Sequence, residues 1–208
     1  AMLDALGAGG VDVSSTARLA DAPTGVALIT VSSDGENTIV VAPGANGRLD
    51  PDAVLATIAP LAGPETVLLS QLEVPLAVVQ AAAHAVAGAG GRVVLNLSPA
   101  RDISAELLAL CDPLVVNESE ARAVGAASFV DAAGALDAAR ALGDRCRSVV
   151  ITLGGDGAVW SDGAGGGHVA APRVDVVDTT GAGDAFVGAL SAELADGASL
   201  ADAVTAGV

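Results

Sequence analysis

The chain has 208 residues, a formal net charge of −16 and 52% hydrophobic residues, of which very few are aromatic. This length suffices for one α/β domain, and a core of Val, Leu, Ile and Ala suits parallel strands flanked by Ala-rich helices. The strong negative charge and the lack of a Lys/Arg cluster disfavour nucleic acid and anionic membranes as partners.

The first elements predict a small β appendage. Residues 24–31 and 38–42 are β-prone runs joined by a segment with an Asp-Gly pair at Asp34-Gly35, which predicts an antiparallel hairpin. Asp50-Pro51 then predicts a helix N-cap followed by proline at the first helical position. We interpret the hairpin as a candidate lid over the C-terminal edge of a sheet.

The remainder of the chain alternates between predicted strands and helices. Strands are expected at residues 66–69, 92–97, 114–116, 148–153, 158–160 and 173–177, and helices at 75–87, 104–110, 118–124, 132–142 and from Leu200 onward. Such alternation implies an α/β fold with a mostly parallel sheet and helices on both faces. We therefore divide the chain into a first segment (1–23), a β lid segment (24–46) and an α/β core (47–208).

The two cysteines, Cys111 and Cys146, fall in apolar surroundings and lack the spacing of metal ligands. This pattern predicts reduced core thiols in a cytoplasmic protein. No run reaches the apolar length of a membrane span, and no basic-then-apolar leader opens the chain.

The most informative stretch, residues 178–190, reads Asp-Thr-Thr-Gly-Ala-Gly-Asp-Ala-Phe-Val-Gly-Ala-Leu. Its glycines let backbone N–H groups at a helix start approach an anion closely. The acid at the centre, Asp184, would repel a phosphate, so it makes little sense as a phosphate ligand. It makes good sense as a base that takes a proton from a hydroxyl attacking a phosphoryl group.

Three other motifs each allow a structural and a functional interpretation. Asn117-Glu118-Ser119-Glu120 fits a capping box, and equally a nucleotide and magnesium site at the end of a strand. The glycine run 152–157 fits a turn, or a backbone loop against nucleotide phosphates. Glu73 is either a solvated loop charge or an acceptor for sugar hydroxyls. The glycine run 164–167 reads as a loop.

The segment from Asp178 to Ser191 resembles the C-terminal signature of the phosphofructokinase-B/ribokinase family of carbohydrate and nucleoside kinases. Further family-like segments follow in matching order at 21–29, 35–37, 42–46, 71–76, 96–100 and 117–120. One mild departure is Leu97-Ser98, where the family usually has a Pro-Ala pair. The resemblance implies a ribokinase-like three-layer α/β/α fold with a β-hairpin lid. It also implies ATP-dependent phosphorylation of D-ribose to D-ribose 5-phosphate.

The same resemblance implies a role for each matching residue. Asp184 would be the catalytic base, and it would contact the sugar together with Glu73. The set implied for the anion hole is Gly181, Ala182 and Gly183, and the set implied for ATP is Asn117, Thr152, Leu153, Gly154, Gly155, Asp156, Gly157 and Gly183. Glu120 would position magnesium through water, and Asp178 with Thr180 would bind a monovalent cation, typically potassium. The hairpin would also mediate a homodimer.

Two sugar-binding patterns of the family, Asn-x-Asp and Gly-Gly-Lys-Gly-Ala-Asn, do not occur in this sequence. The resemblance therefore predicts a fragment that lacks both ends and exposes an unpaired, apolar sheet edge. Two classes of function stay open. One is a kinase for ribose, with fructokinase-like or adenosine kinase-like acceptors as alternatives, and the other is a catalytically incompetent sugar- or nucleotide-binding fragment.

Overall fold

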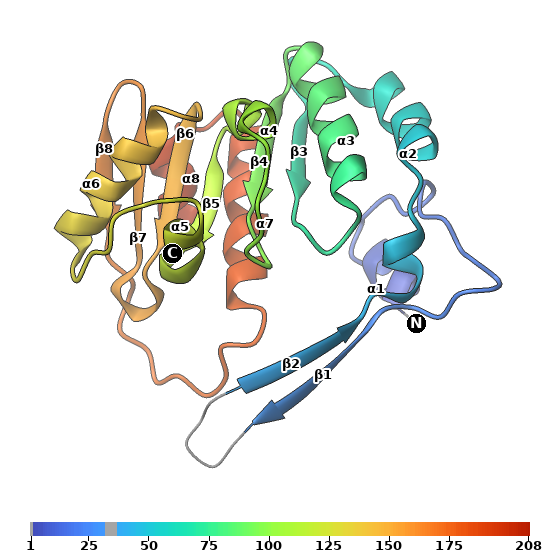
Figure 1. The fold of residues 1–208 in the computed structure, drawn as a ribbon, viewed down its shortest axis with the longest axis horizontal. Helices are drawn as coiled ribbons and strands as arrows, with labels where there is room; N and C mark the ends of the chain where they lie inside the picture. Colours follow the sequence, from blue (N-terminus) through green and yellow to red (C-terminus); the bar gives the residue numbers. More distant parts are fainter. Residues whose placement is uncertain (1, 32–36) are drawn as a thin grey trace.

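The computed structural model describes residues 2–31 and 37–208, and its centre is a six-stranded sheet (Figure 1). In spatial order the strands are β3 (Val67–Ser70), β4 (Arg92–Asn96), β5 (Leu114–Asn117), β6 (Ser148–Thr152), β7 (Ala158–Asp162) and β8 (Gly166–Val169). Strands β3 to β6 run parallel, whereas β7 and β8 are antiparallel additions. The predicted mostly parallel sheet is confirmed.

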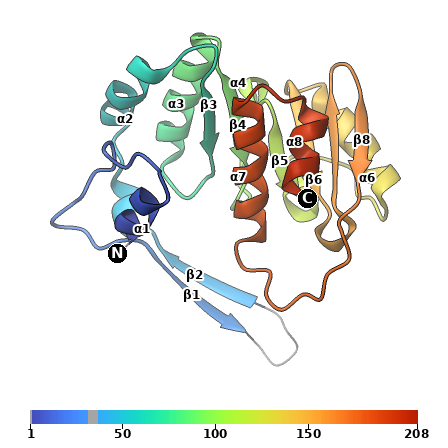
Figure 2. The same cartoon turned by 180° about the vertical axis from the view of Figure 1, so that it is seen from behind.

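Helices cover both faces of the sheet. One face carries α3 (Leu76–Gly88), α4 (Ala105–Leu110), α5 (Glu118–Ala123) and α6 (Ala132–Gly143), and the other carries α7 (Ala182–Ala195) and α8 (Leu200–Gly207) (Figures 1 and 2). A further helix, α2 (Pro51–Ile58), packs beside α3. Short 3₁₀ turns complete the connections at Gly44–Arg48, Ala59–Leu61 and Gly154–Asp156. The expected three-layer α/β/α fold is confirmed.

Among the described residues, none of the helices is long and apolar enough to cross a membrane.

Strand β4 shows how the sequence builds two cores from one sheet. Val93 and Leu95 belong to the core under α3 to α6, whereas Val94 belongs to the core under α7 and α8. Successive side chains of a strand point to opposite faces, so an uninterrupted apolar run is what a sheet buried on both sides requires. The same alternation directs Asn96, the last residue of β4, toward the face that α7 covers.

The first part of the chain forms a separate hairpin. Strands β1 (Val26–Val31) and β2 (Asn37–Ala42) pair antiparallel, as predicted, while the expected Asp34-Gly35 turn lies outside the described residues. In Figure 1 the hairpin projects from the end of the sheet toward which the arrow of β3 points. Its apolar side chains Leu28 and Val40 are 66% and 61% exposed, so the hairpin leaves apolar surface uncovered. A short helix that the sequence did not predict, α1 (Met2–Ala8), precedes it.

Two local predictions are wrong. Residues 173–177 form no strand, and Val177 in this segment is 98% exposed, because its β-prone side chains meet no neighbouring strand that could pair with them. The predicted loop at 164–167 is half wrong, since Gly166 and Gly167 begin β8. A Cβ at Gly167 would lie 3.2 Å from Trp160 Nε1, so the Trp160 ring occupies the space that a side chain would need.

Both cysteines are free and buried, as expected for core thiols. Burial raises the pKa of Cys146 to about 11 and also raises the pKa of Cys111. Both groups therefore stay protonated at neutral pH, and neither has the thiolate character of a reactive cysteine.

The interior position of β4, between β3 and β5 and covered on both faces, makes its core side chains sensitive to truncation. Leu95 is 0% exposed, so Leu95→Ala should lower the free energy of unfolding by about 2–5 kcal/mol, which urea denaturation would measure. Val130→Ala is the control, because its side chain is fully exposed and the change should stay within about 0.5 kcal/mol. Equal effects of the two changes would contradict the packing described for β4.

Candidate active site

The polar residues singled out in the sequence meet in a cavity of about 220 Å³, the central cavity, at the carboxyl ends of the parallel strands. Its polar lining comes from the ends of β4, β5 and β6 and from the start of α7: Asn96, Ser98, Asn117, Glu120, Thr152, Gly181, Gly183 and Asp184. Ligands of open α/β sheets bind at this edge, because loops from neighbouring strands converge there.

The start of α7 offers unpaired backbone donors to this cavity. Gly181 is the N-cap, with a left-handed φ of 76°. Ala182 donates its N–H to the Thr179 carbonyl oxygen over 3.1 Å, but the N–H groups of Gly181, Gly183 and Asp184 donate to no described residue. Unpaired donors and the positive end of a 14-residue helix dipole together favour a bound anion.

Asp184 lies within the first turn of α7, and its carboxylate is exposed. It lines the central cavity and also a second cavity of about 380 Å³, the β3-side cavity, whose other polar residues include Ser70 and Gln71. Asp184 therefore stands between a pocket edged by free N–H groups and a pocket that could hold a polar molecule. This position suits a proton acceptor at the boundary between two reactants.

The capping box predicted after β5 is confirmed. Asn117 Oδ1 accepts from the Glu120 N–H over 2.9 Å, and Glu120 Oε2 accepts from the Asn117 N–H over 2.8 Å. Glu120 is only 6% exposed. Burial raises the pKa of its carboxyl, and hydrogen bonds from the Asn117 N–H and the Ser98 side chain oppose that rise. The cap holds one carboxylate rigidly at the wall of the central cavity.

The glycine run after β6 is a tight turn, as its structural interpretation required. Leu153 donates its N–H to the Gly157 carbonyl oxygen over 2.7 Å. Gly157 has a φ of +91°, and a Cβ there would collide with the Val169 carbonyl oxygen. Beyond the turn lies a third cavity of about 540 Å³, the α8-side cavity, lined mainly by glycine and apolar residues, among them Gly154, Gly157, Ala182, Phe186 and Ala206.

The three cavities join in a row. The central and β3-side cavities share Asn96, Asp184 and Val187, and the central and α8-side cavities share Thr152, Gly183 and Phe186. A molecule in the β3-side cavity would thus face Asp184, and an elongated molecule could run from the central cavity into the α8-side cavity.

Several predicted site residues lie at the margin of this row. Glu73 is exposed and lines none of the three cavities, although its neighbours Gln71 and Val74 line the β3-side cavity. Leu153, Gly155 and Asp156 belong to the turn but line none of the cavities either.

Asp178 and Thr180 form a local turn in the exposed segment before α7. Asp178 Oδ1 accepts from Thr180 N–H over 2.8 Å and from Thr180 Oγ1 over 2.7 Å, and these hydrogen bonds lower the pKa of Asp178. The carboxylate therefore stays ionised three residues before Gly181, which has the first free N–H group at the start of α7.

Sequence reasoning gave no role to Asn96, Ser98, Gln71, Phe186 or Val187, although all of them line the cavities. A signal existed for Asn96 and Gln71, since each is a polar residue at or just after the carboxyl end of an apolar parallel strand. For Phe186 and Val187 the helical pattern gave no such signal, because apolar residues in a helix usually serve the core.

Among the described residues, no three His, Cys, Asp or Glu side chains lie together as a metal-binding cluster. Glu120 is one buried carboxylate at the cavity wall. This fits a hydrated magnesium ion that is held mainly by phosphate oxygens and water, which is how Mg²⁺ commonly binds in phosphate-transfer sites.

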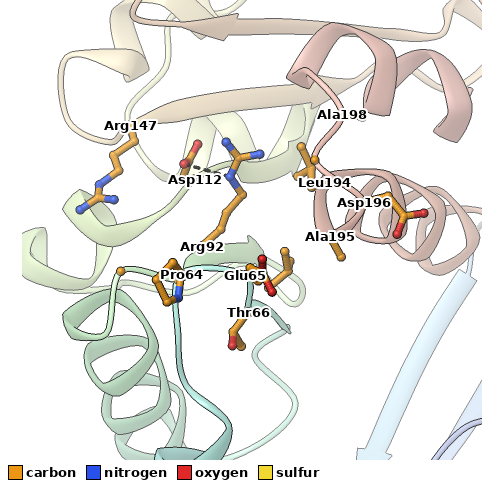
Figure 3. A pocket seen from close by; sticks show the side chains of 14 residues that line it. Pro64, Glu65, Thr66, Arg92, Asp112, Arg147, Leu194, Ala195, Asp196 and Ala198 are labelled. Carbon is orange, nitrogen blue, oxygen red and sulfur yellow. Dashed lines mark ion pairs between the residues drawn. The ribbon is translucent and has the colours of Figure 1, made fainter.

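A larger hollow of about 830 Å³ lies at the opposite, amino-terminal edge of the sheet (Figure 3). Arg92 and Arg147 line it, and Arg92 Nε is paired with Asp112 Oδ2 at 3.2 Å. The C-terminal end of α7 and Asp196 also face this hollow, so the negative end of the α7 dipole lies beside it. It contains none of the signature residues, and we do not assign the reaction to it.

The chain is similar to known carbohydrate kinases. Residues 1–208 match the profile of the pfkB family carbohydrate kinases. Ribokinase of Schizosaccharomyces pombe is 34% identical over 98% of this chain, and ribokinase of Staphylococcus aureus is 35% identical over 95%. Arabidopsis thaliana ribokinase, solved with ribose and ATP, matches 88% of this chain and 60% of its own, with 29% identity and a TM-score of 0.75. The chain spans 65% of the length of each of the two curated relatives.

The buried Glu120 carboxyl generates a pH-dependent prediction. Its pKa is raised above the ordinary 4.5, so the folded chain keeps this proton to higher pH than the unfolded chain. The free energy of unfolding therefore falls as the pH rises from the pKa of Glu120 in the unfolded chain to its higher pKa in the folded chain. Glu120→Gln keeps an acceptor for the Asn117 N–H but cannot ionise. The unfolding free energy of this variant, relative to that of the unmodified chain, should rise as the pH increases above the ordinary glutamate pKa of 4.5.

Glu118→Gln is the matched control, because Glu118 lies in the same first turn of α5 but is exposed. Chemical denaturation across the pH range should give a nearly constant difference for this variant. A flat or falling difference for Glu120→Gln would contradict a pKa of Glu120 that burial raises.

Proposed function

The chain belongs to the pfkB family of carbohydrate kinases, and from that premise we propose that it transfers the γ-phosphoryl group of ATP to D-ribose, giving D-ribose 5-phosphate. The observation that carries the proposal is the position of Asp184. Its carboxylate lies where the β3-side cavity opens into a cavity edged by free backbone N–H groups. The ribokinase names of the relatives favour ribose as the acceptor.

In the proposed reaction the primary hydroxyl of the sugar loses its proton to Asp184 as its oxygen attacks the γ-phosphorus. A new phosphorus–oxygen bond forms to the sugar, and the bond from the γ-phosphorus to the β–γ bridging oxygen breaks. The electron pair of that bond leaves on ADP. The free N–H groups of Gly181 and Gly183 are the donors that would stabilise the negative charge on the transferred group.

The row of cavities gives each reactant a place. ATP would lay its phosphates in the central cavity beside Asn117 and Thr152, and its base in the largely apolar α8-side cavity beside Gly154 and Gly157. Magnesium, when bound with the nucleotide, would neutralise phosphate charge, and Glu120 would hold one of its waters. The sugar would occupy the β3-side cavity, with Glu73 at its margin as a hydroxyl acceptor.

Three further features extend the proposal. Asp178 and the backbone of Thr180 would hold a potassium ion that orders the turn before α7. The hairpin, with its exposed Leu28 and Val40, would close over the sugar as a lid and pair with a second copy of the chain. Two free, buried cysteines fit a reducing compartment, so we assign the protein to the cytoplasm.

Replacing the base separates a kinase from a binding protein. Asp184→Asn removes the proton acceptor, and general-base catalysis is worth about a hundred- to ten-thousandfold, so ribose-dependent ADP release should fall by that factor. Binding of ATP should change little. Asp196→Asn is the matched control at the opposite end of α7, and its turnover should equal that of the unmodified chain.

The assay compares D-ribose with fructose, adenosine and no acceptor, in the presence of magnesium and potassium. Turnover with ribose alone would support the proposal in full, and a preference for another acceptor would move the substrate within the family. If ATP and ribose bind but no acceptor is phosphorylated, the chain is a binding fragment and the proposed activity is wrong.

The proposed cation site makes turnover depend on potassium. Asp178→Asn keeps an acceptor for Thr180 but removes the negative charge. The potassium concentration for half-maximal turnover should then rise about tenfold, which corresponds to roughly 1.4 kcal/mol of binding free energy. Asp175→Asn, in the same exposed segment, should leave this concentration unchanged. If both variants respond to potassium alike, Asp178 is not a ligand.

A further inference from the structure

Asn96 is a polar residue that belongs both to a family-like segment and to two of the cavities, yet has no role in the function proposed above. It ends β4 and is 9% exposed. Together with Asp184 and Val187 it lines both the central cavity and the β3-side cavity. It therefore stands where the two reactants would meet, beside the group assigned as the base.

Asn96 is a buried residue whose amide has no partner among the described residues. Its side chain makes no hydrogen bond to any residue in the part of the chain that the structure describes, whereas Asn117 Oδ1 at the end of the neighbouring strand accepts two hydrogen bonds within its cap. The residue is 9% exposed, and its amide atoms are not fully enclosed by the described residues, so they are accessible from the cavities that Asn96 lines. A ligand in the cavity would supply the missing partner.

The surrounding backbone fixes the direction of this side chain. Asn96 pairs in register with Val115, and Val94, which lies two residues earlier in β4, packs in the core under α7. Residues two apart in a strand face the same side, so Asn96 points toward α7. The first turn of that helix supplies Asp184 and the free N–H groups.

We propose that Asn96 is a catalytic residue that donates a hydrogen bond from Nδ2 to a non-bridging oxygen of the phosphoryl group during its transfer. This inference rests on the proposed kinase function and adds a side-chain donor to the backbone donors of α7. The transferred group would be held between the end of β4 and the start of α7. Asn96 takes up and releases no proton in the step, because the proton of the hydroxyl goes to Asp184.

The chemistry of the site explains why an uncharged donor fits this position. A carboxylate here would repel both Asp184 and the phosphoryl oxygens. A guanidinium or ammonium group would pair with Asp184 and hold it as a weaker base. An amide donates to the phosphoryl oxygen without doing either.

The test compares Asn96→Ala and Asn96→Asp in the ribose-dependent assay. Loss of one preorganised donor to developing charge typically costs about a hundredfold in kcat, so we expect that loss for Asn96→Ala. The KM values for ATP and ribose should stay within about threefold, because the contact is made mainly in the transition state. Asn96→Asp should lose at least as much, since it adds repulsion to the loss of the donor.

Gln80→Glu is the matched control for the change from amide to acid. Gln80 lies on α3 and lines none of the three cavities, and its Nε2 donates to Ser104 Oγ over 3.4 Å. The turnover of Gln80→Glu should match that of the unmodified chain. Thermal unfolding of all variants would show that the folds are intact. A loss in Asn96→Ala that appears in KM for ribose alone, or no loss at all, would overturn the proposed role.

A second measurement keeps this role distinct from the kinase proposal. Magnesium–ADP with aluminium fluoride mimics the transferred phosphoryl group, and its binding can be followed by calorimetry without any turnover. Fluoride should tighten ADP binding to the unmodified chain and to Gln80→Glu, but much less to Asn96→Ala. If turnover is absent while this difference persists, the kinase proposal fails and the donor role stands. Equal fluoride effects in all variants, or none in the unmodified chain, would overturn the donor role.

Discussion

The packing of α7 against the sheet is the constraint on which the rest of the site depends. Val187, Leu190 and Leu194 are buried against the sheet, in a core that also holds Val94 of β4 and Val115 of β5. This packing fixes the position of α7 along the strands, so that its first turn lies beside their carboxyl ends. The free N–H groups of Gly181 and Gly183 therefore face the cavity without any side chain having to hold them there. No free energy is needed to orient these N–H groups when a ligand arrives, because hydrophobic contacts of Val187, Leu190 and Leu194, about one to three turns along α7, have already fixed the helix.

The packing of α7 against parallel strands also explains why the reactive groups come from distant parts of the chain. Parallel strands end at one edge, and each contributes its last residue there: Asn96 from β4 and Asn117 from β5. These positions need polar side chains immediately after apolar ones. At a strand end beside a ligand site, one residue packs in the core and the next one or two line the cavity, so the side chains must change from apolar to polar within that distance. Loss of packing in β4 would thus displace both the core and the site, since Leu95 and Asn96 are neighbours.

Sequence alone predicted what depends on local interactions and on strongly patterned segments. The capping box at Asn117 and Glu120, the N-cap at Asp50 and the buried strands all follow from short-range rules, and all are present. The segment 173–177 failed because its alternating valines predict a strand only if a partner strand lies beside it, and that depends on tertiary structure. Strand β8 was missed for the converse reason. Gly166 and Gly167 have no β propensity, and their pairing with β7 depends on the Trp160 side chain that lies over them.

In the site, the row of three cavities could not be predicted from sequence spacing, because Asn96 and Asp184 are 88 residues apart in sequence (184 − 96) and meet only through the fold.

The charge of the chain gives the site its chemical character. With 25 acidic and 9 basic residues, the protein would repel a polyphosphate at long range. Yet the residues that line the three described cavities include no Lys or Arg, so no side-chain cation offsets that repulsion locally. An anion can bind there only through oriented backbone N–H groups, uncharged side-chain donors and a cation that arrives with it. This reliance on dipoles leaves Asp184 without a basic partner among the residues that line the cavities. The lack of arginine among the lining residues and the presence there of an Asp184 carboxylate without a cationic partner are thus two consequences of one arrangement.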